Sequence, residues 1–236
     1  MTGPGQGAML WPGVATRWRR ALGRLGWRVR RSLGWRAEGT TLVETLGPLR
    51  LVILPSVFNG VRLRTGAFLA DAFDAGSSLE QARVLDLGTG SGIGAVVAAR
   101  AGARVTATDI NPEAVRCAQV NALIHHVDHQ VDVRLGDLFE PVRGERFDVV
   151  LFNPPYYRGH PRDVTDAAWR SVDAFDRFLA QLPAHLTRGG FALVVLSTDG
   201  DVGSALRAAA HLKTRLVRER DFGNERLVVY EVRAIS

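Results

Sequence analysis

The chain has 236 residues, 46% of them hydrophobic and 23% charged, a composition typical of a globular protein with room for one large α/β domain. Its single cysteine, Cys117, excludes an intramolecular disulfide and a Cys-based metal cluster, and no apolar run reaches the ~18 residues of a membrane span. The Arg19-Arg20 pair is not followed by the apolar segment of an export signal, so we expect a cytoplasmic protein.

The positive charge is concentrated at the N-terminus. Nine Arg and two Glu lie in residues 1–50, whereas residues 51–236 hold 21 basic and 22 acidic residues. We predict that residues 1–40 form a basic arm, rich in Arg and Trp and partly disordered. Three interpretations of this arm remain open: it binds nucleic acid, it lies on an anionic surface, or it is a solvated tail.

The next segment is predicted to form a β-hairpin followed by a loop on the substrate side. In residues 41–66, two strand-like runs flank a turn at Gly47-Pro48. Thr65 is a plausible N-cap for a helix over about residues 67–75, because its hydroxyl can accept from a free backbone N–H.

From residue 67 to residue 236 we predict one domain in which strands and helices alternate. The predicted strands cover residues 84–87, 105–109, 131–135, 147–152, 191–196, 212–219 and 226–233. The predicted helices cover residues 93–101, 112–123, 168–182 and 201–210. Alternation of this kind indicates a doubly wound, mostly parallel α/β sheet, and the closeness of the last two strands predicts an antiparallel pair at its edge.

A glycine-rich loop joins the first strand of this domain to its helix. Gly88 and Gly90 allow the backbone to approach a ligand closely. Residues 90–95 also satisfy the dinucleotide pattern G-x-G-x-x-G/A, but a single match of that kind is weak evidence. Asp86 argues against a dinucleotide, because its carboxylate would repel a pyrophosphate.

Acidic residues follow three successive strands. Asp86 suits a ligand that carries an amino group and a sulfonium, Asp109 suits ribose hydroxyls, and Asp137 could accept from an adenine amine. This set matches S-adenosylmethionine better than a nucleotide with phosphates. The alternative is that these carboxylates are solvated and cap helices.

The segment Asn153-Pro154-Pro155-Tyr156 follows the apolar strand over residues 147–152, at the edge where ligands bind in open α/β sheets. We hypothesise that Asn153 Oδ1 and the Pro154 carbonyl accept the two N–H bonds of a planar amide or amine, and that Tyr156 stacks on it. The alternative is a Pro-rich turn.

Taken together, these motifs resemble those of the class I S-adenosylmethionine-dependent methyltransferases. The resemblance covers about residues 50–235 and is closest to the HemK/PrmC-like branch and the methyltransferase small domain group. It implies a seven-stranded Rossmann-like sheet with an antiparallel last strand. It also implies S-adenosylmethionine as the cofactor and Asn153, Pro154 and Tyr156 as catalytic residues. The implied cofactor residues are Thr65, Asp86, Gly88, Gly90, Asp109, Ile110, Asp137 and Asn153.

Two features depart from that branch. We expect the basic arm to stand in the place of the helical N-terminal substrate domain of that branch, and the acids of the family's Pro-x-Glu motif are missing from Asn59 to Gly66. The resemblance implies N-methylation of a protein glutamine, with a translation release factor as a possible partner. Other readings are N-methylation of adenine or guanine amino groups in RNA or DNA, of a small-molecule amine, or a non-catalytic RNA-binding module.

Two weaker features complete the analysis. His125 and His129 are four residues apart, but they lie near the end of a polar helix, so we expect surface histidines and no metal site. Residues 157–169 are expected to form either a lid over the acceptor or a plain surface loop.

Overall fold

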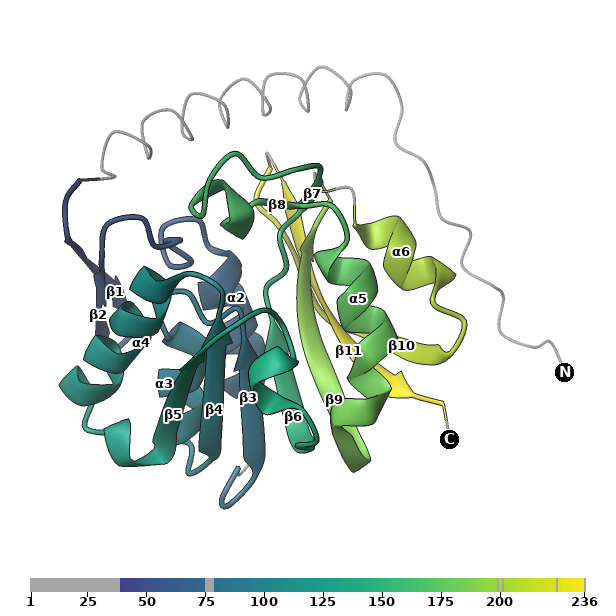
Figure 1. Cartoon of the computed structure of the whole chain (residues 1–236), viewed down its shortest axis with the longest axis horizontal. Coiled ribbons are helices and arrows are strands. Elements are labelled where there is room, and N and C mark those ends of the chain that lie inside the picture. Colours follow the sequence, from purple (N-terminus) through teal and green to yellow (C-terminus); the bar gives the residue numbers. More distant parts are fainter. Residues whose placement is uncertain (1–38, 75–78, 199, 201, 224, 236) are drawn as a thin grey trace, which may run out of the picture.

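The computed structural model describes residues 39–74, 79–198, 200, 202–223 and 225–235 (Figure 1). The interpretations of the basic arm concern residues 1–38, which lie outside the described residues. No helix within the described ranges is long and apolar enough to cross a membrane.

A seven-stranded sheet forms the middle layer of the fold, with the strand order β10-β11-β9-β6-β3-β4-β5. Its strands are β3 (Arg83–Leu87), β4 (Arg104–Asp109), β5 (Val131–Leu135), β6 (Phe147–Phe152), β9 (Leu186–Ser197), β10 (Leu212–Asp221) and β11 (Arg226–Ala234). β11 pairs antiparallel with both β9 and β10, and the other pairings in this sheet are parallel. The predicted seven-stranded, mostly parallel sheet with an antiparallel last strand is therefore confirmed.

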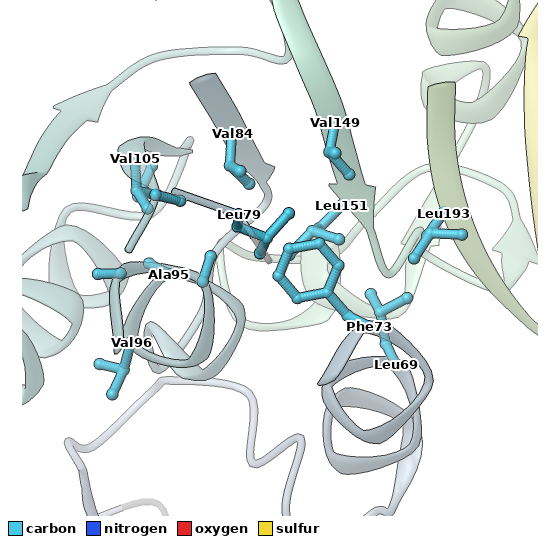
Figure 2. Packing of buried hydrophobic residues seen from close by; sticks show 14 of the residues in the cluster. Leu69, Phe73, Leu79, Val84, Ala95, Val96, Val105, Val149, Leu151 and Leu193 are labelled. Atoms are coloured by element: carbon cyan, nitrogen blue, oxygen red, sulfur yellow. The ribbon is translucent and has the colours of Figure 1, made fainter. Parts of the chain in front are cut away.

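Helices cover both faces of the sheet (Figure 1). One face carries α2 (Thr65–Asp74), α3 (Ile93–Arg100) and α4 (Pro112–Ile124), and the other carries α5 (Ala174–Gln181), η4 (Leu182–His185) and α6 (Gly203–Ala208). Leu69 and Phe73 of α2 pack near Leu151 and Leu193 (Figure 2). Val150 belongs to the cluster on the opposite face, and both it and Leu151 are fully buried. Burial on both faces explains why β6 is an uninterrupted apolar run.

The N-terminal hairpin forms a separate two-stranded sheet of β1 (Leu42–Leu46) and β2 (Leu49–Ile53). It is attached to the domain through Asn121 of α4, which is fully buried. Asn121 Oδ1 accepts from Val52 N at 2.8 Å, and Asn121 Nδ2 donates to Val52 O at 2.7 Å and to Ser91 O at 2.8 Å. The side-chain amide of Asn121 thus bonds the backbone of β2 at Val52, as a second neighbouring strand would, and connects the hairpin to the glycine loop.

The segment between β6 and α5 differs from the helix predicted over residues 168–182. It contains β7 (Tyr157–Arg158), η3 (Asp166–Ala168) and β8 (Arg170–Ser171). Two other short 3-10 helices, η1 (Asp128–Gln130) and η2 (Glu140–Val142), flank β5 earlier in the chain. Tyr157 N donates to Trp169 O at 2.9 Å, so this backbone pairs with β7 rather than within a helix. The helix begins at Ala174, whose N–H donates to Ser171 Oγ at 3.0 Å.

Asn121→Ala should lower the free energy of unfolding by about 2–4 kcal/mol, because it removes the hydrogen bonds that Val52 N and Ser91 O make to this amide. Gln119→Ala on the exposed side of the same helix is the matched control and should change stability by less than about 0.5 kcal/mol. Chemical denaturation measures both variants. Equal stability of the two would show that the hairpin does not depend on this amide.

Candidate functional site

A cavity of about 230 Å³ lies at the carboxyl ends of the parallel strands. It is lined by the glycine loop, by the ends of β4 and β6, by the start of α2 and by the segment that precedes α5. The predicted site residues on this lining are Asp86, Gly88, Gly90, Asp109, Ile110, Asp137 and Asn153. Ligand sites in doubly wound folds occupy this edge of the sheet, so the cavity is the candidate site.

Asp86 fixes the start of the glycine loop. Its Oδ2 accepts from Thr89 Oγ1 at 2.6 Å and from Ala95 N at 2.9 Å. Burial raises the pKa of Asp86 to about 6, and the hydrogen bonds from Thr89 and Ala95 oppose this increase. Gly94 passes directly over the carboxylate, since a Cβ at Gly94 would lie 2.6 Å from Asp86 Oδ1. The sequence therefore needs glycine at this position to bring α3 close to the acid.

Asp109 holds the other end of the same loop. Its Oδ2 accepts from Gly90 N and its Oδ1 from Asn111 N, both at 2.9 Å. Gly90 has a φ of +54°, in the left-handed region that favours glycine. Burial raises the pKa of Asp109, and the backbone donors lower it. Beside it, the side chain of Ile110 is exposed and supplies an apolar surface on the cavity lining.

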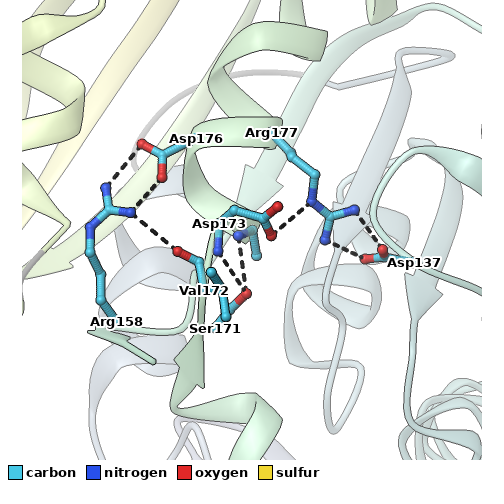
Figure 3. A network of polar contacts seen from close by, with 8 residues as sticks. Asp137, Arg158, Ser171, Val172, Asp173, Asp176 and Arg177 are labelled. Carbon is cyan, nitrogen blue, oxygen red and sulfur yellow. Dashed lines mark hydrogen bonds and ion pairs between the residues drawn. The ribbon is translucent and has the colours of Figure 1, made fainter. Parts of the chain in front are cut away.

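Asp137 lies on the cavity lining in an ion pair that the sequence does not reveal. Arg177 of α5 donates through Nη1 to Asp137 Oδ2 at 2.6 Å and through Nη2 to Oδ1 at 3.3 Å. Arg177 Nε also donates to Asp173 Oδ1 at 3.1 Å (Figure 3). The carboxylate expected to accept from an adenine amine is thus already paired with a guanidinium. No motif marks Arg177, because 40 residues separate it from Asp137.

The Asn-Pro-Pro-Tyr segment places Asn153 and Pro155 on the cavity lining. Asn153 Nδ2 donates to Thr65 Oγ1 at 3.1 Å, and Asn153 Oδ1 accepts from the Tyr156 hydroxyl. Thr65 is the first residue of α2 and is buried, so its hydroxyl serves Asn153 instead of the predicted N-cap. The amide of Asn153 is therefore held from both sides.

Tyr156 and Pro154 are not among the residues that line the cavity. Tyr156 is only 4% exposed, and burial raises the pKa of its hydroxyl far enough to keep it a donor. This position differs from the expectation that its ring stacks on the acceptor. In this structure Tyr156 supports Asn153 from the protein interior.

The segment over residues 157–173 covers the cavity, and several of its residues are among those that line it. Trp169 contacts Phe58 edge to face, with ring centroids 4.8 Å apart. Arg158 of β7 pairs with Asp176 of α5 through Nη1–Oδ2 at 2.6 Å and Nη2–Oδ1 at 3.0 Å (Figure 3). These contacts give the lid interpretation a structural basis, because they fix the segment against α5 and the loop after β2.

Inside this lid, Asp166 is 1% exposed and accepts from both the backbone and the guanidinium of Arg162. Arg170 Nε lies 3.4 Å from Asp166 Oδ2. Burial favours a raised pKa for Asp166, but the bonds from Arg162 and the charge of Arg170 hold the pKa below its usual value. Phe58 and Asp166, like Arg177, are site residues that the sequence motifs did not identify.

The histidines considered for a metal do not gather at this site. His125 Nε2 lies 3.1 Å from Arg50 O, beside the hairpin. Among the residues with described positions, no group of three His, Cys, Asp or Glu is arranged to hold a metal ion.

The residues of the cavity fit S-adenosylmethionine. Ser91 lines the cavity, and its Oγ is buried without a hydrogen-bond partner in the described part of the chain. The glycine backbone on the lining leaves space for a ligand, and the carboxylate of Asp86 is an acceptor of the kind that an amino group needs. Asp109 adds a second carboxylate to the lining, and Ile110 adds an apolar side chain. A pyrophosphate would meet the carboxylates of Asp86 and Asp109 instead of cations.

Comparison with known proteins gives curated relatives that are named as methyltransferases. The release factor glutamine methyltransferase of Gloeobacter violaceus is 35% identical over 198 residues, which cover 77% of this chain and 69% of that protein. The enzyme of the same name from Xylella fastidiosa is 34% identical over 174 residues, covering 68% and 62%. The ribosomal protein uL3 glutamine methyltransferase of Bradyrhizobium diazoefficiens is 35% identical over 157 residues, covering 59% and 49%. The chain thus spans between about half and two thirds of the length of most of these relatives.

Solved structures share the fold at lower identity. A 16S rRNA N2 methyltransferase of T. thermophilus, in complex with AdoMet and guanosine, has a TM-score of 0.62 at 20% identity, covering 81% of this chain and 50% of that one. The ribosomal protein L11 methylase of Lactobacillus delbrueckii subsp. bulgaricus has a TM-score of 0.57 at 20% identity, covering 80% and 97%.

The family model for the methyltransferase small domain matches residues 48–223, which include the glycine loop, Asp109, Asp137 and the Asn-Pro-Pro-Tyr segment. This agrees with the resemblance and with the cofactor predicted from the motifs. The chain belongs to the methyltransferase small domain family of S-adenosylmethionine-dependent methyltransferases.

Proposed function

We propose that the chain methylates the side-chain nitrogen of a protein glutamine. The observation that carries the proposal is the fixed amide of Asn153, held between Thr65 and Tyr156 on the lining of the cofactor cavity. Relatives named as glutamine methyltransferases of release factors and of ribosomal protein uL3 support the same acceptor. A release factor or a ribosomal protein is therefore the proposed partner, and the cytoplasm, where these substrates occur, is the proposed location.

Methyl transfer to an amide needs positioning and hydrogen-bond acceptors more than a strong base. S-adenosylmethionine, when bound, supplies the electrophilic methyl group. The amide nitrogen is a weak nucleophile because its lone pair is delocalised into the carbonyl group. Asn153 Oδ1 has two lone pairs, so it can accept from a substrate N–H as well as from Tyr156. This acceptor favours positive charge on the nitrogen in the transition state.

Atoms and charge balance without another reagent. The new N–CH₃ bond forms as the methyl–sulfur bond breaks, and the acceptor nitrogen then loses one of its protons to water. The lid around Trp169 can exclude bulk water from the cavity while the methyl group is transferred, which strengthens the hydrogen bonds to the acceptor; the proton leaves to water afterwards.

A second candidate is methylation of a base amino group in RNA. The specific observation is a relative named ribosomal RNA small subunit methyltransferase C from Alcanivorax borkumensis, 31% identical over 149 residues. Those residues cover 42% of that protein, so this candidate ranks below the glutamine proposal. An adenine or guanine amino group is also planar and presents two N–H bonds to the same acceptors.

Asn153→Ala should lower kcat for methyl transfer to a glutamine-containing protein substrate by about 10²–10³-fold, the usual effect of removing one transition-state hydrogen bond. S-adenosylmethionine binding, measured by calorimetry, should change by less than about threefold, because the cofactor acids remain. Loss of cofactor binding in parallel with turnover would contradict the assignment of Asn153 to the acceptor.

Thr65 and Tyr156 should act as positioning residues for Asn153. Thr65→Val keeps the shape of the side chain but removes its oxygen, and Tyr156→Phe removes the hydroxyl. Each should lower kcat about tenfold while the KM for the cofactor stays unchanged. Thr65→Ser, which keeps the oxygen, should retain most of the wild-type kcat. The assignment is wrong if Thr65→Ser is as slow as Thr65→Val.

The pKa of Asp86, about 6 in the folded protein, predicts a pH-dependent cofactor affinity. The carboxylate must be ionised to bind an ammonium group, so affinity should fall about tenfold per pH unit below pH 6. The free energy of unfolding should instead decrease as the pH rises. A carboxyl group with a raised pKa in the folded state stabilises the fold at low pH, and this contribution is lost as the pH rises through 6. Calorimetric titration with S-adenosylmethionine between pH 5 and pH 8 measures the affinity.

Asp86→Asn is the matched variant for this titration. It should bind S-adenosylmethionine weakly at every pH in that range, since its amide oxygen can still accept from Ala95 N but carries no charge. If the wild-type protein binds equally well at pH 5 and pH 7, Asp86 does not carry the ammonium contact.

A further inference from the structure

A second cavity, of about 710 Å³, lies between the β1–β2 turn, α2, α3 and the end of β10. Three guanidinium side chains line it, those of Arg64, Arg100 and Arg220, together with the ring of Phe222. We call this the basic cleft. It is separate from the cofactor cavity, but Arg64 directly precedes Thr65, so the two lie on either side of the start of α2.

Among the residues with described positions, no acidic side chain pairs with the three arginines of the basic cleft. Asp71 is the one acid on the described lining, and its Oδ2 already pairs with Arg218 Nη2 at 2.7 Å. The guanidinium carbons of Arg64 and Arg220 lie 4.8 Å and 5.0 Å from the centroid of the same Phe222 ring. Two cations gathered on one aromatic ring without a carboxylate form a site for an anionic ligand.

The backbone of Arg64 adds an independent observation. Its φ is +70°, in the left-handed region that residues other than glycine rarely adopt. Such a conformation is unfavourable for a residue with a Cβ and concentrates at functional positions. In this chain it accompanies a guanidinium that stacks on Phe222.

β10 is the edge strand of the sheet (Figure 1), and it carries further cationic side chains. Lys213 and Arg215 alternate with Thr214 and therefore share one face of β10. A bulge between Leu216 and Arg218 brings Arg218 back to that face, where it contacts Asp71 of α2. Successive cations along this row are separated by about 6.6 Å, the length of two strand residues.

This concentration of cations is local. Residues 51–236 hold 21 basic and 22 acidic residues, so the average surface of the domain is near neutral. Along the row, Glu231 pairs with Arg215 at 2.6 Å, whereas Lys213 has no acidic partner in the part of the chain with described positions. The basic cleft and the row from Lys213 to Arg218 together form one positive surface in a domain without a net positive charge.

We propose that this surface binds the phosphate backbone of a single RNA strand. A periodic row of cations that ends in a cleft with an aromatic ring is the arrangement by which proteins follow a sugar–phosphate chain and stack its bases. An acidic polypeptide fits less well, because carboxylates need neither the regular spacing nor the ring. The surface runs to the start of α2, so RNA bound there lies next to the acceptor site.

The test compares two triple variants of the full chain. The cleft variant carries Arg100→Gln, Lys213→Gln and Arg220→Gln, three exposed cations of the proposed surface. The control variant carries Arg116→Gln, Arg143→Gln and Arg207→Gln, which remove the same charge at exposed positions on other elements. The Arg-rich residues 1–38 are present in both and contribute equally. Thermal melting checks that both variants are folded.

Fluorescence anisotropy with a labelled single-stranded RNA of about 20 nucleotides gives the readout. The cleft variant should bind at least about tenfold more weakly than wild type, and its plot of log K against log salt concentration should be shallower by about 2. The control variant should stay within about twofold of wild type.

Two results would overturn the proposal. One is equal RNA affinity for the cleft and control variants. The other is an equally large loss of binding to a labelled polyglutamate peptide, which would assign the surface to an acidic polypeptide. Neither result bears on the glutamine proposal, because the cleft variant leaves Asn153, Thr65 and the cofactor acids intact.

Discussion

The buried carboxylate of Asp86 is the interaction on which the rest of the site depends. It accepts from Thr89 in the loop after β3 and from the backbone of Ala95 in α3, so it ties the loop to the first turn of the helix. The approach of α3 to this acid requires glycine at Gly94. Burying a carboxylate is unfavourable, which the raised pKa of Asp86 reflects, and the hydrogen bonds only partly offset it. A cationic group in the cavity would offset the rest of this unfavourable free energy. The buried carboxylate of Asp86 therefore lowers the stability of the fold but favours a cationic ligand.

Two side-chain amides extend this loop into a complete site. Asn121 joins the glycine loop to the hairpin through Ser91 and Val52, and Asn153 joins β6 to α2 through Thr65. Each amide satisfies backbone or hydroxyl groups on segments far apart in the sequence, so each fixes the relative position of two elements. The first fixes the cavity wall at the glycine loop, and the second fixes the wall at the start of α2.

Much of the fold and the cofactor side follows from local sequence. Each of its motifs can be recognised from neighbouring residues alone: the apolar runs of β3 and β6, the Gly88–Gly94 loop and the acid at Asp109. The sheet that these motifs predict is the one observed. The helix predicted from residue 168 was wrong over its first residues, because Tyr157 recruits that backbone into a short sheet.

The features of the candidate site that could not be predicted from the sequence depend on contacts between residues far apart in the chain. Arg177 reaches Asp137 across 40 residues, and Phe58 meets Trp169 across the cavity. Tyr156 could not be assigned from its motif, because a tyrosine beside Asn-Pro-Pro can face either the cavity or the interior. Asn121 did carry a signal, as a polar residue on a helix face otherwise made of Ala114, Cys117 and Ala118.

The central claim is that the fixed amide of Asn153 presents acceptors to a protein glutamine. The most direct test incubates the purified chain and isotope-labelled S-adenosylmethionine with a cell extract, followed by separate nuclease and protease digestion and mass spectrometry of the labelled product. The account predicts label that survives nuclease, is released by protease, and resides as one methyl group on a glutamine side-chain nitrogen. Label released by nuclease, or found on another type of residue, would contradict it.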